Sequence, residues 1–327
     1  MEEAEDGMWR GRFAPTPSGL LHLGNAAAAL LAWLQIRSMN GEFVLRIEDI
    51  DGPRSKAEFA RRIPGDLRWL GLDWEEGPDV GGPSGPYIQS QRLGYYGSVL
   101  DALDKLGRTY SCYCSRAELA AIASAPHGLA SEGPAYPGIC KKASKEELAE
   151  KAARKTPSVR FELPAEPLAF VDEAAGLQQV PAGAGGDFIV KRADGILAYQ
   201  LAVVADDAAM GITHVLRGFD LLDSTPRQIW LYQALGWQAP QFAHVPLLLG
   251  PDGSRLSKRH GGITLADMRQ RQIRPETVLG LIAHAYGLLD RFEPAAAKEL
   301  IPLFSLQALP KEAVRLSEED LAAVAYG

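Results

Sequence analysis

The sequence predicts an α/β fold built around a Rossmann-like parallel sheet. Short apolar strand-like segments alternate with helix-like segments in the first third of the chain, the order expected when crossover helices connect parallel strands. The 327 residues suffice for one large domain or for two to three smaller ones. With 46% apolar and 23% charged residues, the composition is that of a globular protein and not of a disordered chain.

The N-terminal part carries the strand-helix-strand pattern that predicts this sheet. Strands are expected over residues 9–14 and 43–47, and helices over about 25–38, 55–70 and 91–106. Pro15 to Gly19 forms a loop after the first strand, and Asn40-Gly41 is a typical helix stop. Pro64 is expected to disturb the middle of the second helix.

The middle of the chain, about residues 124–184, is rich in Pro, Gly and Ala and is expected to be an irregular insertion with one helix near 144–154. Strand-like segments return at 188–191, 198–204 and 213–217. A helix over about 226–235 follows Ser224-Thr225, which could cap it. After Gly261 the chain is expected to be helical and amphipathic.

Charge and hydropathy exclude several classes of protein. No apolar run approaches the roughly 20 residues that a membrane span needs, so no membrane association is expected. The acidic start, with Glu2, Glu3, Glu5 and Asp6, lacks the features of a signal peptide, which predicts a cytoplasmic protein. The formal net charge is −7, so a general nucleic-acid binder is not expected, and an RNA partner would require a local basic surface.

The three cysteines, Cys112, Cys114 and Cys140, are an odd, clustered set that does not look like a disulfide framework. Together with Tyr136, their thiolates could complete a tetrahedral zinc shell. Zinc held only by protein ligands would be structural and would cross-link the segments of the insertion. The alternative is three reduced cysteines beside a core tyrosine.

Two polar motifs could carry chemistry. The first runs from Arg12 to Gly19 and continues with His22-Leu23-Gly24-Asn25, where a strand, a tight loop and a helix start can form a phosphate-binding corner. The second, Asp252 to Arg259, could neutralise the charge of a leaving pyrophosphate. Taken alone, the first motif is equally compatible with a strand-turn-helix that carries a surface histidine. The second is equally compatible with a solvated basic turn.

Together these motifs resemble the class I glutamyl- and glutaminyl-tRNA synthetases. The segment from Arg12 to Gly24 resembles their first signature with its HIGH motif, and Arg255 to Arg259 resembles their KMSKS loop. The resemblance covers about residues 12–287 and includes further blocks at 45–51, 187–200, 215–220 and 225–229. The narrower likeness is to the glutamyl-queuosine tRNA(Asp) synthetases, which lack an anticodon-binding half and show the Cys-x-Cys and Tyr-x-x-x-Cys pattern.

The resemblance implies an enzyme, a ligase that activates L-glutamate with ATP without needing tRNA. It would then transfer glutamate to queuosine in the anticodon loop of tRNA(Asp). By resemblance, Arg12 would hold the side-chain carboxylate of glutamate, Glu48 its ammonium group and Arg217 its α-carboxylate. The full set implied for glutamate is Arg12, Phe13, Ala14, Pro15, Thr16, Ser18, Glu48, Tyr199 and Arg217.

ATP, with Mg²⁺, would be bound by His22, Gly24, Asn25, Ser257 and Lys258, among which His22 and Lys258 are the expected catalytic residues. One structural zinc would be bound by Cys112, Cys114, Tyr136 and Cys140. The chain departs from the family pattern at Asn25, which replaces the second histidine of the HIGH motif, and at Thr16 and Ser18, whose order is exchanged.

The resemblance also implies a division of the chain and a monomeric state. A catalytic domain would comprise residues 7–110 and 186–241, interrupted by an insertion over 111–185 that resembles an acceptor-binding domain. Residues 242–327 would form a stem-contact-like helical region carrying the KMSKS-like loop, and no anticodon-binding domain is expected. Two alternatives remain open, a truncated glutamyl-tRNA synthetase charging tRNA(Glu) and a non-catalytic synthetase-like binding protein.

Overall fold

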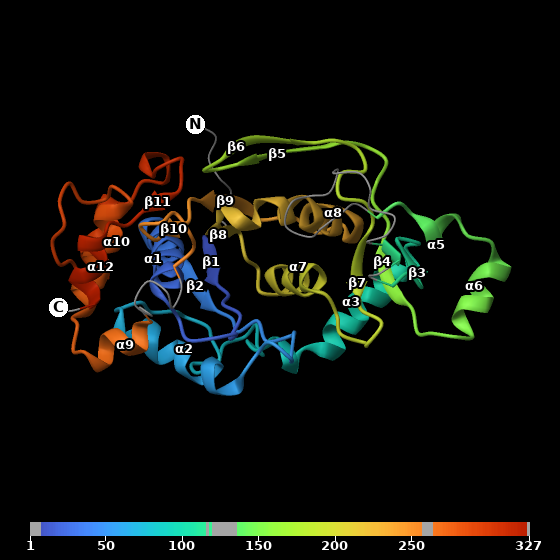
Figure 1. Ribbon diagram of the computed structural model, residues 1–327, viewed down its shortest axis with the longest axis horizontal. Coiled ribbons are helices and arrows are strands. Elements are labelled where there is room, and N and C mark those ends of the chain that lie inside the picture. The colour runs from blue at the N-terminus through green and yellow to red at the C-terminus, as the bar shows by residue number, and fades with distance from the viewer. Residues whose placement is uncertain (1–7, 116–117, 120–135, 257–263, 326–327) are drawn as a thin grey trace.

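The computed structural model describes residues 8–115, 118–119, 136–256 and 264–325, and its centre is a four-stranded parallel sheet (Figure 1). In spatial order the strands are β2 (Glu42–Leu45), β1 (Arg10–Phe13), β8 (His214–Gly218) and β9 (Gln241–Val245). Each pairs in parallel with its neighbour. The predicted α/β fold with a parallel sheet is therefore confirmed.

Helices cover both faces of this sheet, because alternate strand residues point to opposite sides. Phe43 and Leu45 belong to one apolar core, whereas Val44 between them belongs to a second core. The first core is shared with α1 (Leu23–Ser38) and α2 (Ala57–Trp69). The second is shared with α3 (Leu93–Lys105), α7 (Tyr199–Ala209) and α8 (Thr225–Leu235).

The inserted part has its own antiparallel sheet, formed by β3 (Thr109–Cys112), β4 (Ser158–Phe161) and β7 (Phe188–Lys191). Two short helices, α5 (Ile139–Lys142) and α6 (Lys145–Ala152), lie beside it. A long hairpin of β5 (Leu168–Asp172) and β6 (Gly176–Val180) extends back towards β9 (Figure 1). There the backbone N–H of Glu173 donates to the carbonyl of Phe242, over 2.8 Å.

The C-terminal part packs on α1 and completes the first core. It contains a parallel pair of short strands and four helices: β10 (Leu248–Leu249), β11 (Val314–Arg315), α9 (Leu265–Gln270), α10 (Pro275–Ala285), α11 (Ala297–Leu300) and α12 (Glu318–Ala325). Short 3₁₀ helices are η4 (Ile301–Leu303) and η5 (Leu306–Ala308) in this part, and η1 (Gln89–Gln91) and η2 (Phe219–Ser224) earlier in the chain. No helix within the described ranges is long and apolar enough to cross a membrane.

Two expectations about secondary structure are wrong. Residues 199–204 lie in helix α7 and not in a strand, and Ala198 is the N-cap residue of this helix. The apolar residues of α7 are buried in the second core, which its packing against other helices explains. The strand expected at 188–191 forms as β7 and pairs antiparallel with β4 in the inserted sheet. The span 124–184 is not irregular throughout, since β4, β5 and β6 form there through pairings with distant or facing strands.

The expected cap of α8 is also wrong. Ser224 immediately precedes the helix, but its side chain makes no capping hydrogen bond. The hydroxyl of Thr225 instead accepts a hydrogen bond from Arg217, over 2.8 Å. This residue is therefore turned towards the end of β8, where the candidate site lies.

Candidate active site

A cavity of about 280 Å³ opens at the C-terminal ends of β8 and β9 and at the start of α1. This is the edge of a parallel sheet at which ligands of such folds bind. The lining comes from the first motif, from both strand ends and from the start of the second motif: His22, Gly24, Asn25, Ala28, Gly218, Asp220, Val245, Pro246, Leu247, Leu248, Arg255, Leu256 and Tyr286.

The start of α1 presents an anion-binding corner to this cavity. His22 is the N-cap residue, and the side-chain oxygen of Asn25 accepts from its backbone N–H at 3.1 Å. Asn25, at the position of a missing histidine, thus closes the helix start. Burial lowers the pKa of His22, and its Nδ1 atom is buried with no partner among the described residues. A Cβ at Gly24 would lie 3.2 Å from this ring, so glycine leaves space for it.

The second motif reaches the same cavity through Arg255. Its guanidinium pairs with Asp220 at 2.9 Å, and both residues line the cavity. The expected ATP-binding residues Ser257 and Lys258 lie outside the described residues. The described part of the motif thus ends at the cavity where phosphates were expected.

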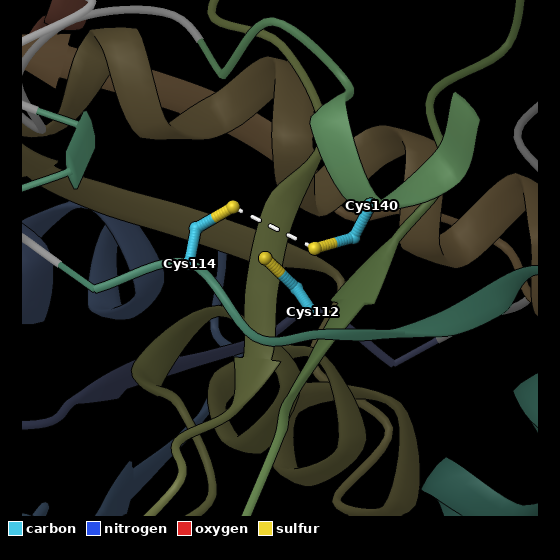
Figure 2. A group of neighbouring side chains, drawn as sticks. All are labelled: Cys112, Cys114 and Cys140. Atoms are coloured by element: carbon cyan, nitrogen blue, oxygen red, sulfur yellow. Dashed lines mark hydrogen bonds between the residues drawn. The ribbon is translucent and has the colours of Figure 1, made fainter. Parts of the chain in front are cut away.

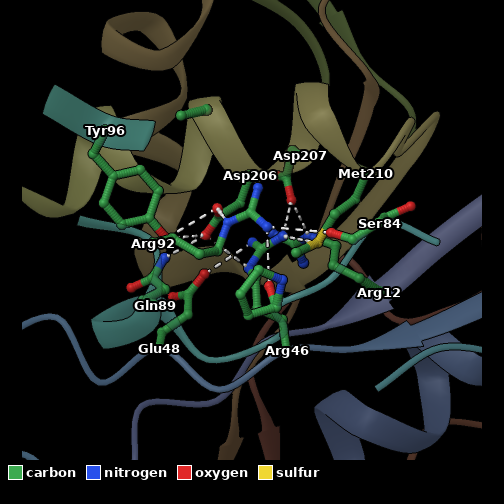
Figure 3. A network of polar contacts seen from close by, with 12 residues as sticks. Arg12, Arg46, Glu48, Ser84, Gln89, Arg92, Tyr96, Asp206, Asp207 and Met210 are labelled. Carbon is green, nitrogen blue, oxygen red and sulfur yellow. Dashed lines mark hydrogen bonds and ion pairs between the residues drawn. The ribbon is translucent and has the colours of Figure 1, made fainter. Parts of the chain in front are cut away.

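A buried network of charged side chains lies beside this cavity at the ends of β1 and β2 (Figure 3). Arg46 is fully buried and contacts Asp207 at 2.7 Å, Glu48 at 2.9 Å and Asp206 at 3.5 Å. Asp206 also accepts from Arg92 at 2.7 Å and from the hydroxyl of Tyr96 at 2.9 Å. Because buried charges must be paired, these contacts hold each carboxylate in a defined position.

Arg12 belongs to the same network but is only partly satisfied. Its Nε atom contacts Asp207 at 3.3 Å. Within the described ranges this is the only polar partner of its side chain, which is 5% exposed, so both terminal nitrogens are available to a ligand. A guanidinium with two adjacent free N–H groups matches a carboxylate bidentately.

The network shifts the pKa values of its acids in opposite directions. Burial raises the pKa of Glu48, although Arg46 and Arg12 oppose the shift. For Asp207 burial acts against ionisation, but Arg12 and Arg46 outweigh it and lower the pKa. Asp207 is therefore the fixed anion of the network.

Arg217, at the end of β8, is a second partly satisfied guanidinium. Its Nε donates to Nε2 of His244 at 2.9 Å and one terminal nitrogen donates to Thr225 at 2.8 Å. The other terminal nitrogen, Nη1, is buried with no partner among the described residues. Burial lowers the pKa of Arg217, as expected for a cation that awaits an anionic ligand.

Tyr199 lies within electrostatic range of both arginines and Glu48. Burial raises the pKa of Tyr199, the charge of Glu48 raises it further, and the charges of Arg217 and Arg12 oppose the rise. The structure thus brings together the four charged or phenolic residues implied for glutamate. Phe13 and Pro15 are instead buried, with Phe13 in the first core, while Thr16 and Ser18 are exposed.

The sequence alone did not predict the roles of Arg46, of the acid pair Asp206-Asp207, or of His244. A signal for the acid pair was present, because two adjacent acids interrupt an apolar run and buried acids require partners. Arg46 lay within a matched block without an assigned role. Nothing in the sequence pattern indicated His244.

The three cysteines converge in the inserted part (Figure 2). All three are free thiols, and their Sγ atoms lie within 4.8 Å of one another. The Tyr136 hydroxyl lies 3.4 Å from Cys112 and 3.7 Å from Cys114. Burial opposes ionisation of Cys112, but hydrogen bonds from Tyr136 and Arg160 lower its pKa to about 7, whereas burial raises the pKa of Cys114 to about 11. This cluster of donors could hold a metal ion.

Comparison with known proteins identifies the family. The model of the class I tRNA synthetase (E and Q) catalytic domain matches residues 8–322. The chain belongs to this family. It is therefore a ligase of the class I aminoacyl-tRNA synthetase type, as predicted.

Individual relatives refine the comparison. The chain is 62% identical to a glutamyl-Q tRNA(Asp) synthetase of Symbiobacterium thermophilum, over 97% of this chain and 98% of that protein. It is 48% identical to one of Nitratidesulfovibrio vulgaris, over 93% and 94%. A solved glutamate tRNA ligase of Elizabethkingia meningosepticum, in complex with its amino acid, superposes with a TM-score of 0.84 at 30% identity, covering 97% of this chain and 69% of that one. The predicted resemblance is thus confirmed.

The buried network gives a prediction about stability. Replacing Asp207 with Asn leaves Arg12 and Arg46 without their shared anion, so the free energy of unfolding should fall by about 3 kcal/mol. Urea denaturation followed by circular dichroism measures this. Asp194→Asn, in an exposed ion pair with Arg192 at 2.6 Å, is the matched control and should leave stability unchanged. Equal effects in both variants would contradict the role assigned to the network.

Proposed function

We propose that this synthetase activates L-glutamate with ATP, without tRNA, and transfers the glutamyl group to queuosine in the anticodon loop of tRNA(Asp). The observation that carries this proposal is the pair of partly satisfied arginines, Arg12 and Arg217, in the same electrostatic neighbourhood as Glu48 and Tyr199. Two cations and one anion complement the two carboxylates and one ammonium group of glutamate. The identities to proteins named glutamyl-Q tRNA(Asp) synthetase support the acceptor.

The division of roles follows from the unused hydrogen-bonding groups. Arg12 would bind the side-chain carboxylate through its two terminal nitrogens, and Nη1 of Arg217 would donate to the α-carboxylate. Glu48, with one oxygen paired to Arg46, would accept from the ammonium group together with the Ala14 carbonyl and Ser18. Thr16, Phe13 and Pro15 would shape the loop and not bind through their side chains.

ATP would lie in the cavity at the start of α1. The N-terminal N–H groups of the helix, Gly24 and His22 would face its phosphates, and Asn25 holds this corner. A glutamate carboxylate oxygen attacks the α-phosphorus, forming glutamyl-adenylate and releasing pyrophosphate, whose charge Lys258 and Ser257 would stabilise. A hydroxyl of queuosine then attacks the adenylate carbonyl and AMP leaves. Mg²⁺ would accompany the phosphates.

The cysteine cluster fits one structural zinc ion. With Zn–S bonds of about 2.3 Å, tetrahedral thiolates lie roughly 3.8 Å apart. The Sγ atoms of Cys114 and Cys140 are 3.6 Å apart, and the Tyr136 oxygen lies at a comparable distance from two of the sulfurs. Cys112, Cys114, Cys140 and Tyr136 would hold the ion and connect the end of β3 to α5.

A basic surface beside the active site would receive the RNA. Arg61 and Arg62 of α2 face Arg269 of α9 across a groove of about 390 Å³, and all three are exposed. We call this group the arginine groove. It adjoins the first motif, because the N–H of Lys56 donates to the Pro17 carbonyl and the N–H of Leu265 to that of Leu21. Arginine pairs strongly with phosphate, so the acidic protein has a local site for the RNA backbone.

The domain division would follow the same plan. We propose a catalytic part over 7–110 and 186–241, an inserted part over 111–185 and a helical part over 242–327, acting as a monomer. The pairing of two strands differs from these limits, since β7, within 186–241, pairs with the inserted sheet, and β9, mostly beyond 241, pairs with the catalytic sheet. Their pairing supports moving β7 to the inserted part and β9 to the catalytic part.

The acceptor is tested with labelled glutamate, ATP and two tRNAs. We expect label on queuosine-containing tRNA(Asp) and none on the same tRNA lacking queuosine. Label on tRNA(Glu) instead would make the protein a glutamate–tRNA ligase.

Arg12→Ala should abolish glutamate-dependent pyrophosphate exchange while the circular dichroism spectrum is retained. Exchange at the unsubstituted rate in this variant would refute the role of Arg12.

Zinc is tested by elemental analysis of the purified protein. We expect about one zinc per chain, falling to near zero in Cys140→Ser, because tight binding requires all the thiolates. The melting temperature of this variant should fall, whereas Ser98→Ala on the exposed face of α3 should change neither value. A natively folded protein with no zinc would contradict the proposal.

The arginine groove is tested by charge reversal. In the double variant Arg61→Glu and Arg62→Glu, glutamyl transfer to tRNA should fall and depend less steeply on salt, because phosphate contacts are lost. Pyrophosphate exchange should be unchanged. Arg291→Glu, on the connection between α10 and α11 outside the groove, is the control and should transfer normally. Unaltered transfer by the double variant would exclude this surface.

A further inference from the structure

The tip of the inserted hairpin reaches the glutamate site through one carboxylate. Asp172 is the last residue of β5, and its side chain is completely buried. Its Oδ1 atom accepts from three backbone N–H groups, those of Ala175 at 2.8 Å, His244 at 3.0 Å and Ala174 at 3.1 Å. Its Oδ2 atom lies 2.6 Å from Nδ1 of His244. Both oxygens are therefore committed, and their roles are not interchangeable.

His244, on β9, connects this carboxylate to Arg217. The N–H of the Arg217 Nε atom always carries its proton, so Nε2 of His244, 2.9 Å away, must accept. The ring proton is then on Nδ1 and is donated to Asp172. Burial is the main cause that lowers the pKa of His244, to about 4, which keeps the ring neutral. Thr225, 3.1 Å from Nε2, also binds Arg217 and completes its support on this side.

We propose that Asp172 and His244 are positioning residues for glutamate activation. Asp172 selects the histidine tautomer that accepts from Arg217, and His244 thereby turns the free Nη1 edge of Arg217 towards the substrate α-carboxylate. The inference rests on the proposed function, in which Arg217 binds glutamate. It adds that the inserted hairpin supplies a part of the amino-acid site, although its strands lie outside the catalytic sheet.

The substitution Asp172→Asn tests the tautomer directly. Three backbone donors require an acceptor at the Oδ1 position, so the new amide oxygen stays there and the NH₂ group faces Nδ1 of His244. Nδ1 must then accept, and the ring proton moves to Nε2, where it opposes the N–H of Arg217. The variant changes little volume, yet it replaces the hydrogen bond from Arg217 to His244 with a contact between two N–H groups, while the bond from Arg217 to Thr225 remains.

Pyrophosphate exchange at varied glutamate and ATP concentrations measures the consequence. In Asp172→Asn we expect the KM for glutamate to rise about 10- to 100-fold, as for a buried hydrogen bond turned unfavourable. The KM for ATP should stay within about twofold. Glu173→Gln, the neighbouring residue whose side chain contacts Gln35 at 3.2 Å, is the matched control and should behave as the unsubstituted protein. Nitrogen-15 NMR of the histidine ring should show Nδ1–H before the substitution and Nε2–H after it.

Two further variants decide the matter if Asp172→Asn does not fold. His244→Asn retains a donor for Asp172 but removes the acceptor for Arg217, so it should lose glutamate affinity. His244→Gln extends an amide oxygen towards the former Nε2 position and should retain more affinity than the Asn variant. Equal KM values for glutamate in both, or a glutamate KM unchanged in Asp172→Asn, would overturn the proposal. Absence of glutamate-dependent exchange in the unsubstituted protein would refute the proposed function itself.

Discussion

A fully buried guanidinium, that of Arg46, is the constraint on which the active site depends. Moving such a charge out of water is very unfavourable unless acids surround it, so Glu48, Asp206 and Asp207 stabilise the fold by compensating the charge of Arg46. Two of these acids come from α7, about 160 residues further along the chain. The network therefore joins the end of β2 to α7, a helix of the second core. Arg12 is held at the edge of this network.

Two buried polar atoms at the candidate site have no hydrogen-bond partner among the described residues, namely Nη1 of Arg217 and Nδ1 of His22. Arg46 and Asp206, in contrast, each form several ion pairs. Native proteins leave few buried polar atoms unpaired, so unpaired atoms grouped at a strand edge are best explained by a ligand. Nη1 of Arg217 lies near the charged network, and Nδ1 of His22 lies at the start of α1. Both atoms are at the same edge of the parallel sheet, which is the arrangement that joining an amino acid to ATP requires.

The inserted part also contributes contacts to this arrangement. Its antiparallel sheet brings the cysteines together at one end, and its hairpin reaches β9 at the other. Because His244 binds Asp172 through one ring nitrogen and Arg217 through the other, hydrogen bonds connect the tip of the hairpin to Arg217.

The sequence by itself determined the parallel α/β core, the helix starts and stops around it, the first motif and the cysteine set, because local periodicity and short-range spacing encode these features. It also indicated Arg12, Glu48, Tyr199 and Arg217, through resemblance to a family and not through local physics. The tertiary structure alone decided that residues 199–204 are helical and that β7 belongs to the inserted sheet, since both depend on packing partners distant in the chain. It also decided the partners of Arg46 and the place of His244 between Asp172 and Arg217, because a buried charge is compensated by whichever groups the fold brings near, and no spacing along the chain records that proximity.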